Sequence, residues 1–150
     1  MPDEEHIADS LEKLVALCRE GESGYREAAE HVTDPELKKL LHEVSRERAR
    51  FAADLQKQAV RRSRSNAARP AHILKAVHRG WVGLRAALGG DNAVLAAVES
   101  RDRYIQEKYD QYIRDGRLPD DILGIIRNQA QAIVGTLDRI RALRRSRKAA

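Results

Sequence analysis

The sequence predicts four long helices, and each carries an acidic or amide side chain near its midpoint, where the helical pattern calls for an apolar residue. These side chains are Glu22, Glu47, Glu99 with Asp102, and Gln129. Because burying a lone ionised carboxylate is very costly, polar groups inside a helical bundle must be hydrogen-bonded, paired with cations or bound to a metal ion. This polar layer is the main pointer to function in the sequence.

One chemistry that the layer could support is metal binding. Glu22, Glu47, Glu99 and Asp102 supply carboxylate oxygens, which hard ions such as Mg²⁺, Ca²⁺ and Mn²⁺ prefer as ligands. Di-metal carboxylate bundles also use histidine at a Glu-x-x-His spacing. In this sequence the residue three positions after Glu47 is Arg50, and the last helix has no histidine. The four carboxylates are therefore candidate ligands for a divalent ion, and they would make a poor iron oxidase.

The alternative chemistry is a buried ionic network, in which carboxylates bind guanidinium groups. Arg48 lies on or beside the inner stripe of its helix, and Arg101 and Arg103 flank Asp102. A guanidinium group can form two parallel hydrogen bonds with one carboxylate, which offsets part of the cost of burial. Because each carboxylate has a plausible guanidinium partner and histidine ligands are missing, we expect the network, without a cofactor, and keep a divalent metal ion as the alternative. A third alternative is that the helix register differs and these charges face solvent.

Apolar periodicity and capping residues define the helices that position this layer. The first helix is expected to end at Thr33 and to run without a break through Gly21 and Gly24, where glycine permits a neighbouring helix to approach closely. The later boundaries are marked by typical capping and breaking residues: Asp34 with Pro35, Asp91 as an N-cap, Gly116, and Pro119 with Asp120 and Asp121. The pattern thus predicts helices packed on helices.

One connection is much longer than the others. It contains a basic linker, 61–69, and then a shorter helix that follows Pro70 and stops at Gly89 and Gly90. A single long connection indicates the topology of ferritin-like bundles, in which the second and third long helices run parallel. The predicted fold is an all-α, ferritin-like four-helix bundle in one domain, 1–150, with a short extra helix in the crossover between the second and third long helices.

The composition of the chain is typical of a single all-α domain outside the membrane. Only 4% of the 150 residues are aromatic and 34% are charged, which suits one all-α domain. No apolar run approaches the roughly 20 residues that span a bilayer, and the N-terminus lacks the layout of a secretory signal, so we expect a cytoplasmic protein without a membrane partner. The lone Cys18 lies on an apolar stripe and is expected to be buried.

The formal net charge of +5 gathers in the linker and in a basic tail, 144–150. Such clusters can bind phosphate, but no aromatic residues alternate with the arginines to stack on bases. The tail is expected to be a fraying helix end whose cations stay solvated. We therefore do not expect nucleic acid as a partner, although a basic phosphate-binding surface remains a further alternative.

Several phrases of the sequence occur together in one known family. They are Gly21-Glu22-Ser23-Gly24-Tyr25, Asp34-Pro35-Glu36-Leu37, Glu47-Arg48-Ala49-Arg50-Phe51, His78-Arg79-Gly80-Trp81 and Asp138-Arg139-Ile140. In these phrases, and over nearly the whole chain, the sequence resembles a bacterial four-helix-bundle family, the domain of unknown function 2383, placed in the ferritin-like superfamily. The resemblance implies the fold, but the family has no assigned biochemical role. It also implies a histidine where this chain has Leu137, which removes a possible metal ligand.

These observations favour a non-catalytic protein. The sequence contains no nucleophile elbow, no phosphate-binding glycine loop and no Ser/His/Asp set, so we do not expect an enzyme. The main hypothesis is an interaction or stress-associated module that forms a homo-oligomer or binds another protein. The rival hypothesis is a metal-binding bundle with a redox or storage role.

Overall fold

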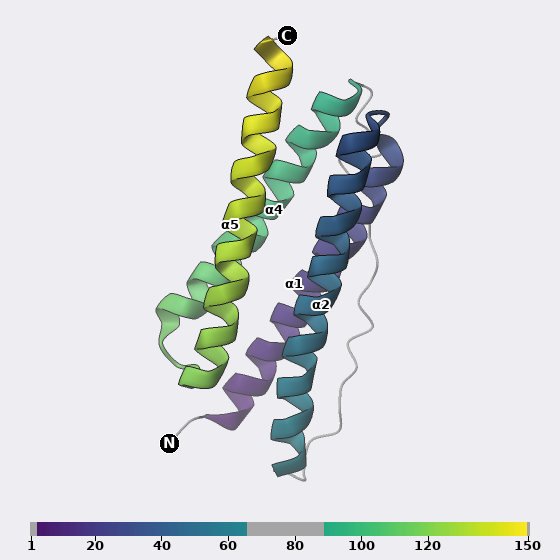
Figure 1. Cartoon of the computed structure of the whole chain (residues 1–150). Coiled ribbons are helices and arrows are strands. Elements are labelled where there is room, and N and C mark those ends of the chain that lie inside the picture. Colours follow the sequence, from purple (N-terminus) through teal and green to yellow (C-terminus); the bar gives the residue numbers. More distant parts are fainter. Residues whose placement is uncertain (1–2, 66–88, 150) are drawn as a thin grey trace.

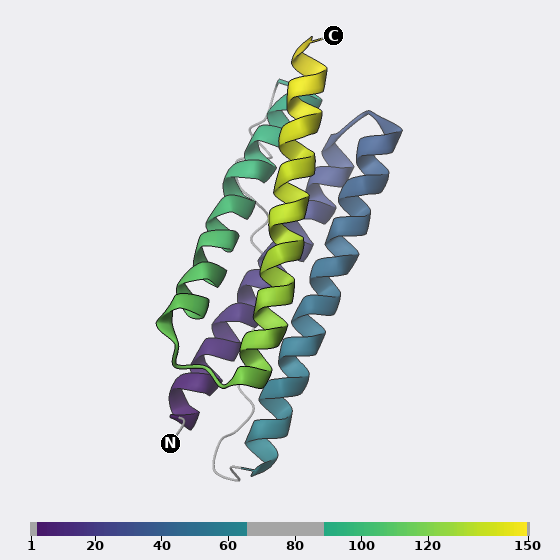
Figure 2. The same cartoon turned by 60° about the vertical axis from the view of Figure 1, so that its left-hand side comes forward.

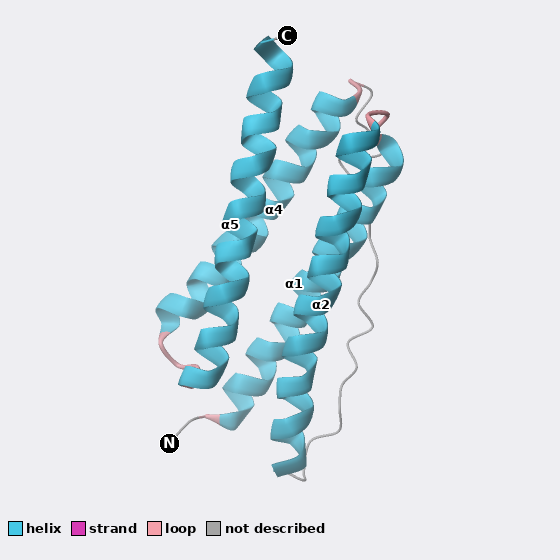
Figure 3. Ribbon diagram, viewed as in Figure 1, coloured by secondary structure: helices cyan, strands magenta, loops and turns pink. Residues whose placement is uncertain are grey.

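A computed structural model describes residues 3–65 and 89–149 of the chain. This part folds into four long helices: α1 (Glu4–His31), α2 (Pro35–Ser65), α4 (Asp91–Asp115) and α5 (Asp120–Ala149). Figure 3 shows only helices and short loops among these residues. The prediction of an all-α four-helix bundle is therefore confirmed.

The helices form two hairpins that pack side by side. The first hairpin joins α1 to α2 and the second joins α4 to α5, while α1 also packs on α4 and α2 on α5. In Figures 1 and 2, α1 and α5 run in one direction, and α2 and α4 run in the other. The expected parallel arrangement of the second and third long helices is thus present, and α2 lies across the bundle from α4.

Local sequence explains most helix boundaries. The side chain of Asp34 accepts a hydrogen bond from the Glu36 amide at 2.9 Å, so α2 begins with Pro35 as predicted. Gly116 adopts a left-handed conformation, with φ 69°, and ends α4 as predicted. Helix α1 continues through Gly21 and Gly24 without interruption, which confirms that both glycines lie inside one helix.

Both predicted basic segments differ from the expectation. Helix α2 continues to Ser65, so residues 61–65 do not belong to a linker. The Arg62 guanidinium reaches Glu4 of α1 at 3.3 Å and Asp121 of α5 at 3.5 Å, and these contacts hold the polar end of α2 on the bundle. The basic tail is the end of α5, which extends to Ala149, but two of the cations that we expected to stay solvated, Arg144 and Arg147, bind carboxylates. The remaining linker, 66–69, and the expected short helix after it lie outside the described residues.

The start of α4 also differs from the expectation. Asp91 is the first residue of the helix, and Gly90, with φ 80°, occupies the N-cap position. Among the described contacts, the Asp91 carboxylate caps no amide of its own helix and instead accepts hydrogen bonds from the corner between α1 and α2. The N-cap assignment was therefore wrong.

The core runs the length of the bundle and consists of aliphatic side chains from all four helices. Fully buried members include Leu11, Leu14, Leu41, Leu55, Leu95, Ile105, Ile126, Ile133 and Leu137. Cys18 is also buried, as predicted. In the described ranges, we find no helix with the length and apolar character needed to cross a membrane.

Candidate functional site

A buried arginine–aspartate pair lies at the centre of the bundle. Arg48 of α2 donates from Nη1 to Oδ1 of Asp102 at 2.5 Å and from Nη2 to Oδ2 at 2.6 Å. The two side chains are 1% and 0% exposed. Since α2 and α4 lie across the bundle from each other, this pair spans the core and joins two helices that do not pack directly on one another.

Helix α1 contributes the hydroxyl of Tyr25 to the same pair, and its Gly21 leaves room for the Arg48 side chain. The Tyr25 hydroxyl donates to Oδ2 of Asp102 at 2.6 Å, and the Arg48 guanidinium lies 5.1 Å from the centroid of the Tyr25 ring. A Cβ at Gly21 would lie 3.1 Å from Nη1 of Arg48, so the missing side chain gives the guanidinium room. Burial, together with the Asp102 charge, raises the pKa of Tyr25, which therefore stays a protonated donor.

A second set of hydrogen bonds continues this layer to α5. The Tyr109 hydroxyl lies 2.9 Å from Sγ of Cys18 and donates to Oε1 of Gln129 at 2.7 Å. Nε2 of Gln129 then donates to the backbone oxygen of Phe51 at 3.3 Å. Burial raises the pKa of the Cys18 thiol to about 11, so it stays neutral at physiological pH. We call the residues of the two sets, Cys18, Tyr25, Arg48, Asp102, Tyr109 and Gln129, the central polar layer.

The central polar layer is closed to most chemistry. Both oxygens of Asp102 already accept hydrogen bonds from Arg48, and one of them also accepts from Tyr25. Burial alone would lower the pKa of Arg48, but the adjacent Asp102 charge outweighs it and raises that pKa, so the guanidinium stays charged. A fixed ion pair without solvent access is poorly suited to act as a general acid, a general base or a nucleophile.

The predicted metal ligands are dispersed. Glu22 binds Arg19 of its own helix at 2.8 Å, and Glu99 binds Arg141 and Arg144 of α5. Glu47 is partly buried, and the structure records no ion pair for it in the described ranges. Among the residues described, no three His, Cys, Asp or Glu side chains form a group that could hold a metal ion.

The guanidinium partners are also distributed differently from the expectation. Arg48 binds Asp102 as the ionic-network hypothesis anticipated, but Arg101 binds Glu20 of α1 and Arg103 is exposed. Glu99 is held by Arg141 and Arg144 of α5, and Arg144 belongs to the tail whose cations we expected to stay solvated. Burial would raise the pKa of Glu99, yet the hydrogen bonds and charges of these arginines hold it below its ordinary value.

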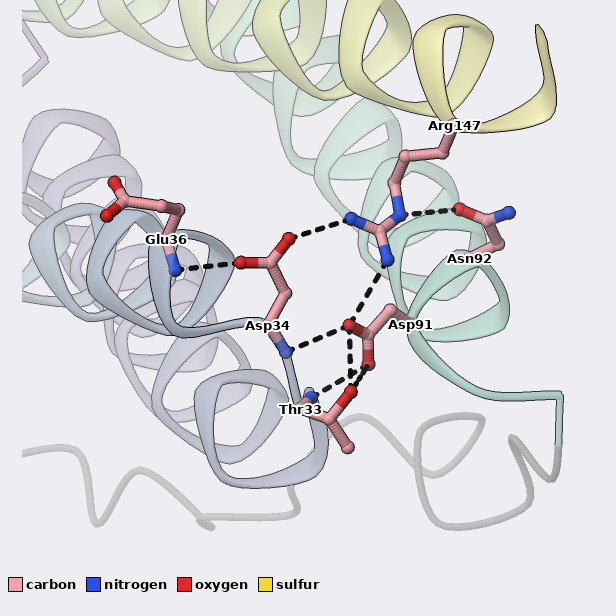
Figure 4. Close-up of polar contacts among 6 residues, drawn as sticks. All are labelled: Thr33, Asp34, Glu36, Asp91, Asn92 and Arg147. Carbon is pink, nitrogen blue, oxygen red and sulfur yellow. Dashed lines mark hydrogen bonds and ion pairs between the residues drawn. The ribbon is translucent and has the colours of Figure 1, made fainter. Parts of the chain in front are cut away.

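Sequence reasoning missed a polar cluster at one end of the bundle (Figure 4). Arg147 of α5 binds Asp34 at 2.9 Å, Asp91 at 3.3 Å and the side-chain oxygen of Asn92 at 3.1 Å. Asp91 also accepts from the backbone amides of Thr33 at 2.8 Å and Asp34 at 3.0 Å. We call these five residues the Arg147 cluster, and it ties the α1–α2 corner to the start of α4 and the end of α5.

A signal for this cluster was present in the sequence. Arg141, Arg144 and Arg147 recur every three residues, which places them on one helix face, and Glu99 and Asp91 are spaced so that they can meet that face from α4. The net charge of this segment alone indicates only a solvated basic run. The periodicity of these arginines would have predicted ion pairs with a neighbouring helix.

A surface groove lies between α1 and α4, on the outside of the bundle. Its volume is about 770 Å³, and its lining includes Leu17 of α1 with Tyr104 and Tyr112 of α4. Three cationic side chains, Lys13, Lys108 and Arg114, also line it. This groove is accessible from solvent, in contrast to the central polar layer.

Comparison with known proteins gives the family of the chain. No curated protein matches it. A family model described as a domain of unknown function (DUF2383) matches residues 6–115, a range that includes Tyr25, Arg48 and Asp102 of the central polar layer. The match covers well over half of the 150 residues, and the chain therefore belongs to the DUF2383 family.

Proposed function

We propose that this protein is a non-catalytic interaction module: a cytoplasmic, ferritin-like bundle that binds a second copy of itself or another protein through its outer helix faces. The observation that carries the proposal is the closed state of the central polar layer. Arg48 and Asp102 are buried, and both Asp102 oxygens accept hydrogen bonds from the guanidinium, while the buried Nε of Arg48 has no hydrogen-bond partner among the described residues. The interior then maintains the shape of the bundle, and contacts with other molecules are left to the surface.

The arrangement of charges supports this division of roles. A metal ion at Asp102 would have to compete with a guanidinium that forms two charge-assisted hydrogen bonds with the carboxylate. Of the other candidate ligands, Glu22 and Glu99 bind different arginines, and Glu47 forms no ion pair with the part of the chain that the structure describes. Binding of a divalent ion by these four carboxylates is the rival proposal, and it requires Arg48 to move away.

The parallel course of α2 and α4 supports the ferritin-like part of the proposal, because that topology needs a single long crossover.

The basic tail gives less support to a phosphate-binding role. Its residues Arg144 and Arg147 are engaged with carboxylates of α4 and of the α1–α2 corner. Their charges are therefore largely neutralised within the molecule.

Metal analysis tests the interior part of the proposal. The full chain is expressed in medium supplemented with iron and manganese, and bound metal is measured by mass spectrometry after purification. We expect no stoichiometric metal in the unmodified protein. One or more metal ions per chain, lost in Asp102→Asn, would overturn the proposal in favour of the metal-binding bundle.

Site-specific photo-crosslinking tests the surface part. A photoreactive residue is placed at Tyr104 on α4 or at Val134 on α5, which are 42% and 37% exposed, and the cells are irradiated. A module of this kind should give a discrete cross-linked protein product from at least one face. A variant with the photoreactive residue at the buried Ile105 serves as the negative control. Absence of any product from both exposed positions would contradict an interaction role.

A further inference from the structure

We propose that the groove between α1 and α4 binds an acidic segment of a partner protein, with an apolar side chain of that segment seated against Leu17 and Tyr112. This inference rests on the proposed interaction function and names the chemical class of the partner. The groove holds about 770 Å³, which is within the usual range for a site that takes a few side chains.

The apolar part of the groove is contributed by both helices. Leu17 and Tyr112 are partly buried, and Tyr104 is 42% exposed, one of the few large hydrophobic side chains with that much exposure in the described part. Burial and the nearby Asp115 and Asp9 charges raise the pKa of Tyr112, so its hydroxyl stays protonated and can donate a hydrogen bond. An apolar side chain with an adjacent acceptor would fit this surface.

The charge of the groove selects an acidic partner. For Lys13, Lys108 and Arg114, the structure records no ion pair within the ranges it describes. One carboxylate, Asp115, also lines the groove and lies 3.2 Å from the His6 imidazole, which carries a charge only when it is protonated. Three cationic side chains against one carboxylate leave the lining with a net positive charge, and carboxylates of a partner would neutralise it.

Beside the groove, the positive charge of Arg101 is neutralised by a carboxylate of the other helix. Arg101 lies one turn before Tyr104 and binds Glu20 across the α1–α4 interface. Lys13 and Lys108 have no such partner in the same interface, as far as the described residues show. An acidic segment laid along the groove would extend the ion pairing that Arg101 and Glu20 begin.

Nucleic acid fits this groove less well. Stacking of a base needs an open aromatic face, but the Tyr104 ring is already contacted by Arg101 at 5.0 Å and by Lys108 at 5.4 Å from its centroid. Tyr112 is only partly exposed. The aromatic residues therefore serve as an apolar surface flanked by cations, which suits a peptide.

Fluorescence anisotropy with a labelled peptide tests the inference. The probe is a short peptide of aspartate and glutamate around a central phenylalanine, titrated with the full-length protein at low salt. We expect saturable binding that weakens at least about tenfold in the double variant Lys13→Glu, Lys108→Glu, because two attractions become repulsions. The matched control, Lys38→Glu with Lys39→Glu on exposed positions of α2, makes the same change in net charge and should leave binding within about twofold.

Two further probes complete the experiment. Replacing the central phenylalanine of the peptide by serine should weaken binding severalfold, while a single-stranded oligonucleotide should bind equally to the groove variant and to the α2 control. Equal loss of peptide binding in both double variants would show a nonspecific charge effect and overturn the inference. Tighter binding of the oligonucleotide that is lost only in the groove variant would also overturn it, in favour of nucleic acid.

The inference and the proposed function fail in different ways. If the photoreactive residue captures a partner at Val134 and none at Tyr104, the protein is an interaction module that does not use this groove. If neither position captures a partner, the interaction function itself fails. Circular dichroism melting of both double variants checks that the helices remain folded.

Discussion

The centre of the bundle and its C-terminal end both rely on an arginine bound to aspartate, but in opposite surroundings. In the centre, Arg48 binds one carboxylate, and both side chains are almost completely buried. At the end, Arg147 binds Asp34 and Asp91, and its side chain is 31% exposed. The centre has no access to ions or protons from solvent, whereas the end is reached by both through the partly exposed Arg147 and Asp34, although the Asp91 side chain there is only 4% exposed.

This difference predicts different kinds of sensitivity. A buried pair gains little net stability over an apolar replacement, but losing one partner strands a charge in the core. A partly exposed cluster contributes less, and salt and pH modulate that contribution. Substitutions in the central pair and in the Arg147 cluster should therefore differ in the size of the stability loss and in its dependence on salt and pH.

The largest effect is expected for Arg48→Met. It leaves the Asp102 carboxylate buried with only Tyr25 as donor, so the free energy of unfolding should fall by about 3–5 kcal/mol in urea titrations. The triple variant Arg48→Met, Asp102→Leu, Tyr25→Phe removes every charge and most of the unpaired groups, and it should recover much of the loss. A single variant as stable as the unmodified protein would show that the pair is not closed to water.

A smaller, pH-dependent effect is expected for Asp91→Asn. Burial would raise the pKa of Asp91, but hydrogen bonds from Thr33 and Asp34 and the Arg147 charge hold it below its ordinary value of 3.8. A carboxyl whose pKa is lowered on folding stabilises the protein fully above its ordinary pKa, and this stabilisation disappears as pH falls through the folded-state value.

The unmodified protein should therefore exceed Asp91→Asn in stability by about 1–2 kcal/mol at neutral pH. The two unfolding curves should converge as the pH is lowered through and below 3.8, where the carboxyl of the unmodified protein takes up its proton. Urea titrations over a series of pH values measure this difference. A gap that stays constant with pH would show that the Asp91 charge does not contribute.

Arg147→Ala should cost less, about 1 kcal/mol at low ionic strength, because this side chain is partly solvated. The cost should shrink as salt is added, and the loss caused by Arg48→Met should not. Melting temperatures of both variants at low and high salt measure the contrast. The neighbouring exposed Arg145→Ala is a matched control that should change stability little.

The smallest effect is expected for Glu47→Leu. The sequence placed Glu47 in the layer, but the structure gives that place to Arg48, so the free energy of unfolding should change within about 0.5 kcal/mol. If Glu47→Leu lowered the free energy of unfolding as much as Arg48→Met, Glu47 would belong to the central polar layer, and a site of four carboxylates would again be supported. The comparison needs only one urea titration beside the Arg48 variant.

The helices could be read from the sequence because their boundaries have local causes. Asp34, Pro35 and Gly116 act through their own backbone or nearest amides, and the predictions at these residues were right. The predicted end of α2 was wrong because contacts of Arg62 with α1 and α5 stabilise a polar turn of the helix beyond it. Asp91 was misassigned because its amide partners come from another corner of the bundle.

The site could be predicted only in part, since it depends on helix rotation. Neighbouring residues on a helix point about 100° apart, so an inner face assigned one position too early places Glu47 at the core in place of Arg48. The same ambiguity separates Glu99 from Asp102, of which only Asp102 joins the central pair. Sequence periodicity located the polar layer, but the choice of its members required the packing of all four helices.

The pairing of Arg48 with Asp102 also sets the alignment of the two hairpins. Aliphatic cores tolerate sliding, because leucine and isoleucine pack against one another in several registers. A shift of one helical turn, about 5.4 Å, would pull the two charges apart and leave both buried without partners. Of the many ways in which α1–α2 could dock on α4–α5, the buried ion pair selects those that keep both charges together, and it thereby helps to hold the surface features in fixed places relative to one another.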